Sequence, residues 1–201
     1  MKAAAIVLLS SGLPARAHDA ITLFGTPVTG FPALMLHPLL TPDQALLLAG
    51  IVLVAGATAR NALPSVALAL VAGMLAGKAG HLIAAFLSAF WYAPLFAAFA
   101  AGLAVAGFGR IGARAGAIAI FVLGFVLAAG IIPEEPTLRG LGLAVGAAIA
   151  TGLVCLALIG LPLTVVAGYL RGIPIRIAGA WLAAIALINL ALAIRILSAQ
   201  G

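Results

Sequence analysis

Charged side chains are scarce in this chain of 201 residues. Lys, Arg, Asp and Glu together make up 7% of the sequence, whereas hydrophobic residues make up 66%. Soluble domains carry charge on roughly 25% of their residues, because their surfaces must be covered with groups that water solvates. The composition therefore excludes an ordinary soluble domain. It predicts an all-α membrane protein in which most of the chain faces lipid or other apolar helices.

Acidic residues and cysteine are rarer still. The chain has 4 carboxylates against 10 Lys and Arg, which gives a formal net charge of +6. The basic residues stand singly between apolar blocks and form no stripe, so we expect no binding to nucleic acid. Single bases at segment ends are typical of topology signals and anchors for lipid headgroups. The one cysteine, Cys155, excludes a disulfide within the chain.

Catalytic motifs are also missing. The sequence has no nucleophile elbow, zinc-protease helix, phosphate-binding glycine loop or dinucleotide fingerprint. Its serines have no His and Asp partners at a suggestive spacing. We therefore expect no enzyme activity and no permanently bound cofactor, since a membrane-embedded enzyme would need a polar cluster inside the helix bundle.

Residues 1–17 have the layout of a cleavable signal peptide. Lys2 supplies the positive start, residues 3–9 form a short apolar core, and residues 15–17 form an A-x-A cleavage site. A membrane span needs about 20 apolar residues, so this core is too short to be one. Cleavage would leave His18 at the mature N-terminus, where its imidazole and the free amine can chelate a metal ion together. An uncleaved anchor, with no role for His18, is the alternative.

The rest of the chain divides into two parts. Residues 18–42 are rich in Gly and Pro and predict an irregular extracytoplasmic segment that lies on or dips into the membrane surface. Residues 43–201 predict a domain of six transmembrane helices. We expect its spans near residues 43–59, 63–77, 90–108, 115–132, 141–168 and 176–195. The fifth is longer than a bilayer requires, which predicts a tilt or a kink at Pro162.

The distribution of charge predicts the orientation of these spans. If the mature N-terminus lies outside, five arginines fall in cytoplasmic turns and three bases fall on the outer side, as the positive-inside rule requires. All the carboxylates and histidines then lie on the outer side. The cytoplasmic set is Arg60, Arg110, Arg114, Arg171 and Arg176, and the outer set is Lys78, Arg139 and Arg195.

Small residues predict how the helices pack. Between lipid-embedded helices, close backbone contact through Gly and Ala replaces the hydrophobic effect as the main source of stability. Three small-residue spacings suit such contacts: Gly73-x-x-x-Gly77, Gly142-x-x-x-Gly146 and Gly168-x-x-x-Gly172. Together they favour a compact bundle over a loose set of spans.

Scarce polar groups gather directly before the first span, in the sequence His37-Pro38-Leu39-Leu40-Thr41-Pro42-Asp43-Gln44. Thr41 suits the N-cap of the span and Pro42 its first position. Asp43, in the first turn, complements the helix dipole, so capping alone could explain this carboxylate.

The alternative explanation for these groups is metal binding. Imidazole and carboxylate together suit borderline divalent ions such as nickel, cobalt or zinc. We predict a metal site at the outer face formed by His37 and Asp43, with His81 and His18 as further candidate ligands. His81 has an alternative interpretation as an interfacial histidine beside Lys78 that contacts headgroups.

The stretch from His37 to Gln44 resembles the H-P-x-x-G-x-D-H motif at the first helix of the HupE/UreJ family. The sequence Ile175-Arg176-Ile177-Ala178-Gly179-Ala180-Trp181-Leu182-Ala183-Ala184 is similar to that family's closing R-V-A-G-S-W-I-A-A helix. Members are small bacterial membrane proteins of hydrogenase and urease gene clusters, regarded as nickel or cobalt permeases or accessory proteins. The resemblance implies a multi-pass protein of the bacterial inner membrane that transports nickel or cobalt, with His37 and Asp43 as metal ligands.

The chain departs from the family motif at two positions. Thr41 stands where the family has Gly, and Gln44 replaces the second His. An amide oxygen is a poorer ligand than imidazole for nickel. The alternative function is therefore a non-transporting accessory protein of metalloenzyme maturation. Expected partners are membrane lipid and a divalent metal ion, with a homo-oligomer or metalloenzyme maturation proteins left open.

Overall fold

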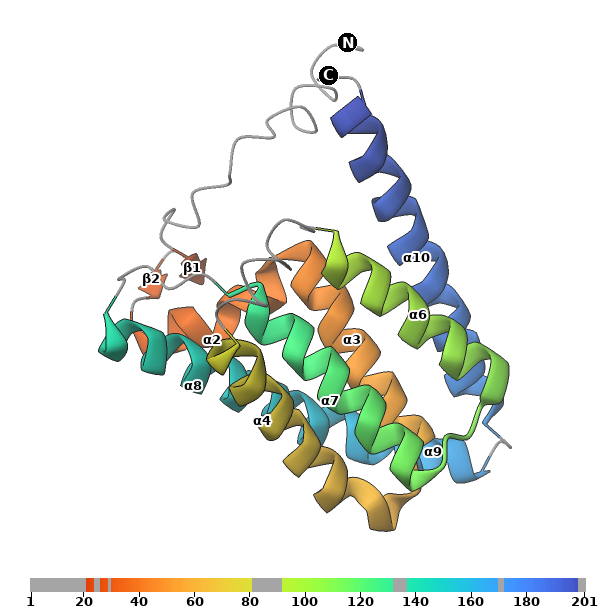
Figure 1. Ribbon diagram of the computed structural model, residues 1–201. Helices are drawn as coiled ribbons and strands as arrows, with labels where there is room; N and C mark the ends of the chain where they lie inside the picture. The colour runs from red at the N-terminus through yellow and green to blue at the C-terminus, as the bar shows by residue number, and fades with distance from the viewer. Residues whose placement is uncertain are drawn as a thin grey trace.

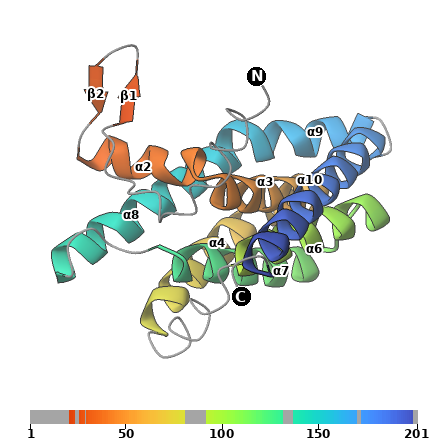
Figure 2. The ribbon, with the colours of Figure 1, turned by 90° about the horizontal axis from the view of Figure 1, so that it is seen from above.

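The computed structural model describes residues 21–23, 26–28, 30–80, 92–131, 137–169 and 172–198. The predicted signal peptide lies outside these residues. Figure 1 shows the arrangement of the elements, and Figure 2 shows the molecule from above. The elements are β1 (Ile21–Leu23), β2 (Thr26–Val28), α2 (Phe31–Leu40), α3 (Pro42–Ala57), the 3₁₀ turn η1 (Arg60–Ala62), α4 (Leu63–Ala79), α6 (Ala93–Phe108), α7 (Ala113–Ala129), α8 (Leu138–Cys155), the π-helical turn η2 (Leu156–Gly160), α9 (Leu161–Tyr169) and α10 (Ile173–Ser198).

The helices from α3 onward fall on the apolar segments expected from the sequence, with ends shifted by a few residues. Within the described residues, three are long and apolar enough to cross a membrane: Arg60–Ala79, Leu138–Gly168 and Ile173–Ile196. The pair α2 and α3 would make a fourth span if this bent pair is counted as one. Helices α6 and α7 are shorter, with 16 and 17 residues. The structure thus supports three to four spans, as in a membrane protein.

The expectation of an irregular segment up to Pro42 is wrong for much of its length. β1 and β2 form an antiparallel hairpin in which Ile21 pairs with Val28, and α2 follows as a regular helix of 10 residues. Pro38 lies inside α2, although proline cannot donate the backbone hydrogen bond of a helix. Contacts elsewhere in the molecule outweigh this local cost, because Pro38 is buried and α2 packs on α8 and α3.

α3 is the central helix. It packs against α2, α6, α7, α9 and α10, and it is drawn in orange at the middle of Figure 1. From Ala45 to Ala57 its residues are apolar on all sides, as expected for a helix that is buried around its circumference. Leu47 and Ile51 are fully buried and Val54 is 1% exposed.

Two helix crossings depend on glycine. Gly73 and Gly77 of α4 lie directly against the backbone of α7, so a Cβ at Gly73 would be 2.9 Å from the carbonyl carbon of Phe121. At the crossing of α6 and α10, a Cβ at Gly102 would be 2.7 Å from the carbonyl oxygen of Gly179. The first of the three predicted spacings is therefore a packing surface, and Gly179 gives the closing motif a structural role.

The other two spacings do not act in the same way. A Cβ at Gly142 or Gly146 would meet nothing within 4 Å, and the same holds at Gly168. Gly172 has a φ of 76°, a conformation that favours glycine, and a Cβ there would be 3.3 Å from the carbonyl oxygen of Gly109. Its role is in the turn before α10.

Three inter-helix turns meet at one end of the bundle. The turn after α3 joins the turn between α6 and α7, where the Ile111 amide donates to the Ala57 carbonyl at 2.9 Å. The start of α10 joins them, because Arg176 Nε donates to the carbonyl oxygen of Ala106 at 2.9 Å. We call this the arginine end. Among the described residues, its arginines are Arg60, Arg110, Arg114 and Arg176.

The long fifth segment is interrupted near the predicted position. Cys155 ends α8, and the π-helical turn η2 precedes Leu161 and Pro162 at the start of α9. Proline has no N–H and its ring collides with the carbonyl four residues earlier, which here is that of Leu158 within η2. A π-helical turn is one way to accommodate this collision inside a continuous helix.

Candidate functional site

The polar motif residues lie at a sharp bend between α2 and α3. The two helices meet at 85°, and Thr41 stands between them in an extended conformation. We call residues 37–44 the elbow. Thr41 occupies the predicted N-cap position and Pro42 and Asp43 the first turn of α3.

The prediction that the Thr41 side chain caps α3 is wrong, however. Its hydroxyl makes no bond to α3 and instead donates to the carbonyl oxygen of His37 at 2.8 Å. The backbone N–H of Thr41 donates to the same oxygen at 3.0 Å. Thr41 thereby closes α2 and fixes the bend, which holds the His37 backbone next to the start of α3.

His37 and Asp43 are both half-buried in the elbow. Within the described residues, neither side chain makes a hydrogen bond or an ion pair, and they are not paired with each other. Asp43 is the only carboxylate and His37 the only imidazole among the described residues. Neither has a protein partner in that part of the molecule.

The structure does not describe the other two predicted ligands. His18 and His81 fall outside the described residues. In the part of the chain that is described, no group of three or more His, Cys, Asp or Glu side chains could hold a metal ion. The four-residue metal site thus stays a prediction, of which the structure places two members in one elbow.

Gln44 is a site residue that the sequence did not single out as a ligand. It is 7% exposed, and its Oε1 is buried without a hydrogen-bond partner among the described residues. Leaving a buried acceptor unpaired costs about 1–3 kcal/mol, so proteins usually avoid it. The available signal was its place in the motif, directly after Asp43 and at the position of a histidine.

In the described part of the chain, one side-chain hydrogen bond between helices holds the elbow in place. The Thr151 hydroxyl of α8 lies 2.7 Å from the carbonyl oxygen of Met35 in α2 and 2.9 Å from that of Ala147 in its own helix. Thr151 is buried, so water competes little for this bond. The contact fixes α2 on α8, and with it the position of His37 two residues further on.

Lys78 has a structural partner rather than a place in this site. Its Nζ donates to the carbonyl oxygen of Ile131, just after α7. The bond joins the C-terminal end of α4 to the segment that follows α7, where backbone carbonyls otherwise lack helical partners. The Lys78 ammonium group thus connects the ends of α4 and α7 through this hydrogen bond.

Comparisons of the chain with protein-family models, with curated proteins and with solved structures each found no match. The resemblance to the HupE/UreJ family therefore rests on the residues of the two motifs themselves.

Proposed function

We propose that this chain is a multi-pass membrane protein of the HupE/UreJ type that carries a divalent metal ion, nickel or cobalt, inward across the bacterial inner membrane. The observation that carries the proposal is the elbow. It combines an imidazole, a carboxylate and a buried amide oxygen, none of which has a partner in the described part of the chain. Nitrogen and oxygen ligands of this kind suit borderline divalent ions.

The ion is first bound by His37 and Asp43, whose half-buried side chains are accessible from outside the bundle. Gln44 Oε1 then supplies a third, more buried ligand, which replaces a water molecule of the hydrated ion. Binding a cation would also relieve the cost of leaving this oxygen unpaired. His18 and His81 are candidates to complete the coordination.

The proposed direction follows from the two ends of α3. This helix begins at the elbow and ends next to the arginine end, so the two features are separated by its 16 residues, about 24 Å. The positive-inside rule assigns the arginine end to the cytoplasm, and the elbow then faces outward. The ion would pass between helices whose close packing depends on Gly and Ala.

The alternative is a non-transporting accessory protein that keeps the fold and has lost metal capture. The observation that favours it is the amide of Gln44 in place of an imidazole. Without His18 or His81, the elbow offers one nitrogen ligand, which gives weaker binding of nickel than two.

Uptake of radioactive nickel by cells that express the full chain distinguishes these functions. We expect His37→Ala to lower uptake about tenfold or more, since it removes the one imidazole of the elbow. Asn189→Ala is the matched control, because Asn189 is half-buried and its amide bonds the Ile185 carbonyl of its own helix at 2.9 Å. Equal uptake by wild type and His37→Ala would overturn metal capture by His37.

The reverse substitution tests the alternative. If wild type takes up no nickel and Gln44→His does, the chain is an accessory protein that lost transport through this position. If wild type already transports, Gln44→His should raise nickel affinity while the maximum rate changes little.

A further inference from the structure

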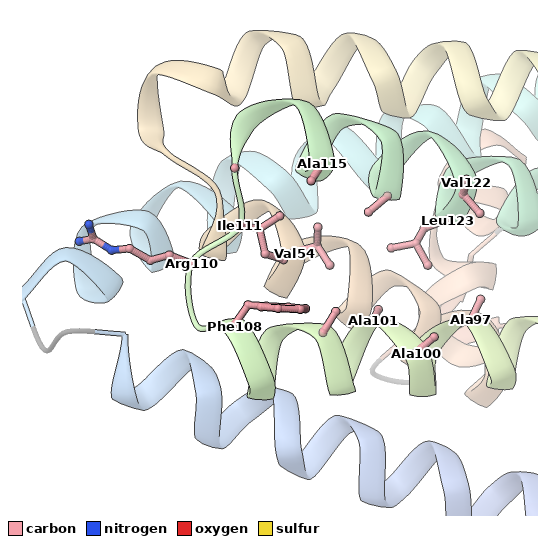
Figure 3. A pocket seen from close by; sticks show the side chains of 13 residues that line it. Val54, Ala97, Ala100, Ala101, Phe108, Arg110, Ile111, Ala115, Val122 and Leu123 are labelled. Carbon is pink, nitrogen blue, oxygen red and sulfur yellow. The ribbon is translucent and has the colours of Figure 1, made fainter.

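A largely apolar groove lies between α6 and α7 on the surface of α3. Its volume is about 530 Å³, within the range of roughly 300–1,000 Å³ that is typical of pockets for small ligands. Its deepest residues are buried, with Val54 at 1% and Leu123 at 5% exposure, whereas Phe108 on its rim is 77% exposed. The groove therefore has a floor inside the bundle and an open side, as Figure 3 shows.

One end of the groove is strongly basic. Arg110 lines it at the arginine end, and in Figure 3 its side chain extends away from the apolar interior, so that the guanidinium lies beyond the last apolar residue. Arg114 follows in the first turn of α7, next to Ala115, which also lines the groove. The first turn of α7 has no acidic residue and no side-chain cap. Its positive dipole end adds to the two arginine charges.

These charges have no counter-charge in the described residues. The guanidinium groups of Arg110 and Arg114 make no hydrogen bond or ion pair there, and both residues are exposed. Asp43, the one carboxylate of the described chain, lies at the opposite end of α3. A ligand that suits the groove must therefore be apolar along its length and anionic at one end.

We propose that the groove binds an acyl chain of an anionic phospholipid, whose phosphate lies between Arg110 and Arg114. Arginine pairs with phosphate through charge-assisted hydrogen bonds, and basic pockets between membrane helices at the cytoplasmic side are suited to anionic headgroups. The acyl chain covers the buried floor formed by Val54, Ala101 and Leu123. A second copy of this chain fits less well, because it would bring further unpaired arginines to the same end.

Lipid binding to the purified full chain tests the proposal by native mass spectrometry in mild detergent. The probes are phosphatidylglycerol and phosphatidylcholine with identical acyl chains. We expect wild type to retain phosphatidylglycerol with at least about tenfold higher affinity than phosphatidylcholine. Arg110→Gln with Arg114→Gln should remove this preference, because each basic residue contributes about one kcal/mol to anionic lipid binding. Arg139→Gln, an exposed arginine of α8, is the matched control and should leave it unchanged.

A second variant tests the apolar part of the site. Ala104→Leu places a larger side chain in the groove and should lower the affinity for both lipids, whereas Ala184→Leu on exposed α10 surface should not. Equal affinity of wild type for the two lipids would overturn the proposal, as would unchanged preference in the double arginine variant. A dimer that Ala104→Leu dissociates would instead identify a second copy as the occupant. Thermal unfolding of each variant shows whether a loss of binding reflects a loss of fold.

Discussion

The crossing of α4 and α7 gives the sharpest prediction about stability. At Gly73 the neighbouring atoms belong to the backbone of Phe121, with its carbonyl carbon 2.9 Å and its Cα 3.0 Å from the position of an added Cβ. Backbone atoms cannot rotate away as a side chain can. Gly73→Ala therefore forces the two helices apart.

The magnitude follows from two opposing terms. Adding a methyl group to a tightly packed interface costs about 1–3 kcal/mol, and here the upper part of this range applies because only backbone faces the new atom. Replacing Gly by Ala inside a helix returns about 1 kcal/mol through helix propensity. The net expectation is a loss of about 2 kcal/mol in the free energy of unfolding.

Gly146→Ala is the matched control, since a Cβ there meets nothing within 4 Å in the middle of α8. It should be neutral or stabilise the protein by up to about 1 kcal/mol. Equilibrium unfolding in mixed micelles of mild detergent and dodecyl sulfate measures both variants. If Gly73→Ala proves as stable as Gly146→Ala, the close contact between α4 and α7 does not exist as described.

Three further predictions concern the elbow and the turns. Thr151→Val should lose about 1 kcal/mol of stability, because it removes the bond to the Met35 carbonyl, whereas Thr164→Val, which removes a solvent-exposed bond to the Leu161 carbonyl, should lose little in the same unfolding assay. Gln44→Leu should raise stability by about 1–3 kcal/mol, because it removes a buried unpaired oxygen, and should lower nickel uptake; a less stable variant would show that the oxygen is paired. Gly109→Ala should lower the thermal midpoint, because Gly109 has a φ of 65° and its added Cβ would be 2.7 Å from Arg176 Cδ; an unchanged midpoint would contradict this.

The positions of the apolar helices were predictable because each depends on a continuous run of local hydrophobicity. The start of α3 at Pro42 was also predictable from local signals, because Thr41 stands at the N-cap position and Asp43 in the first turn. The helix α2 was not predictable, since Pro38 and the neighbouring glycines and prolines argue locally against it. Its stability comes from burial against α8 and from the Thr151 bond, which connect residues more than 100 positions apart in the sequence.

The candidate site was also predictable only in part. Residue type and spacing indicated His37 and Asp43, because imidazole and carboxylate are rare in this chain and stand close together. The sequence did not show that Gln44 is buried with an unpaired oxygen, because this depends on the side chains that surround α3. For the glycine spacings, the sequence could not distinguish Gly73, which contacts α7, from Gly146, which faces open space.

Nickel binding to the purified full chain tests metal capture at the elbow most directly. Isothermal titration of wild type, His37→Ala and the control Asn189→Ala, all in the same detergent, measures the affinity of the elbow for the ion without any transport step. We predict that His37→Ala binds nickel at least about tenfold more weakly, a difference of about 1.4 kcal/mol, while Asn189→Ala matches wild type. Equal affinities for wild type and His37→Ala would contradict metal capture at this site.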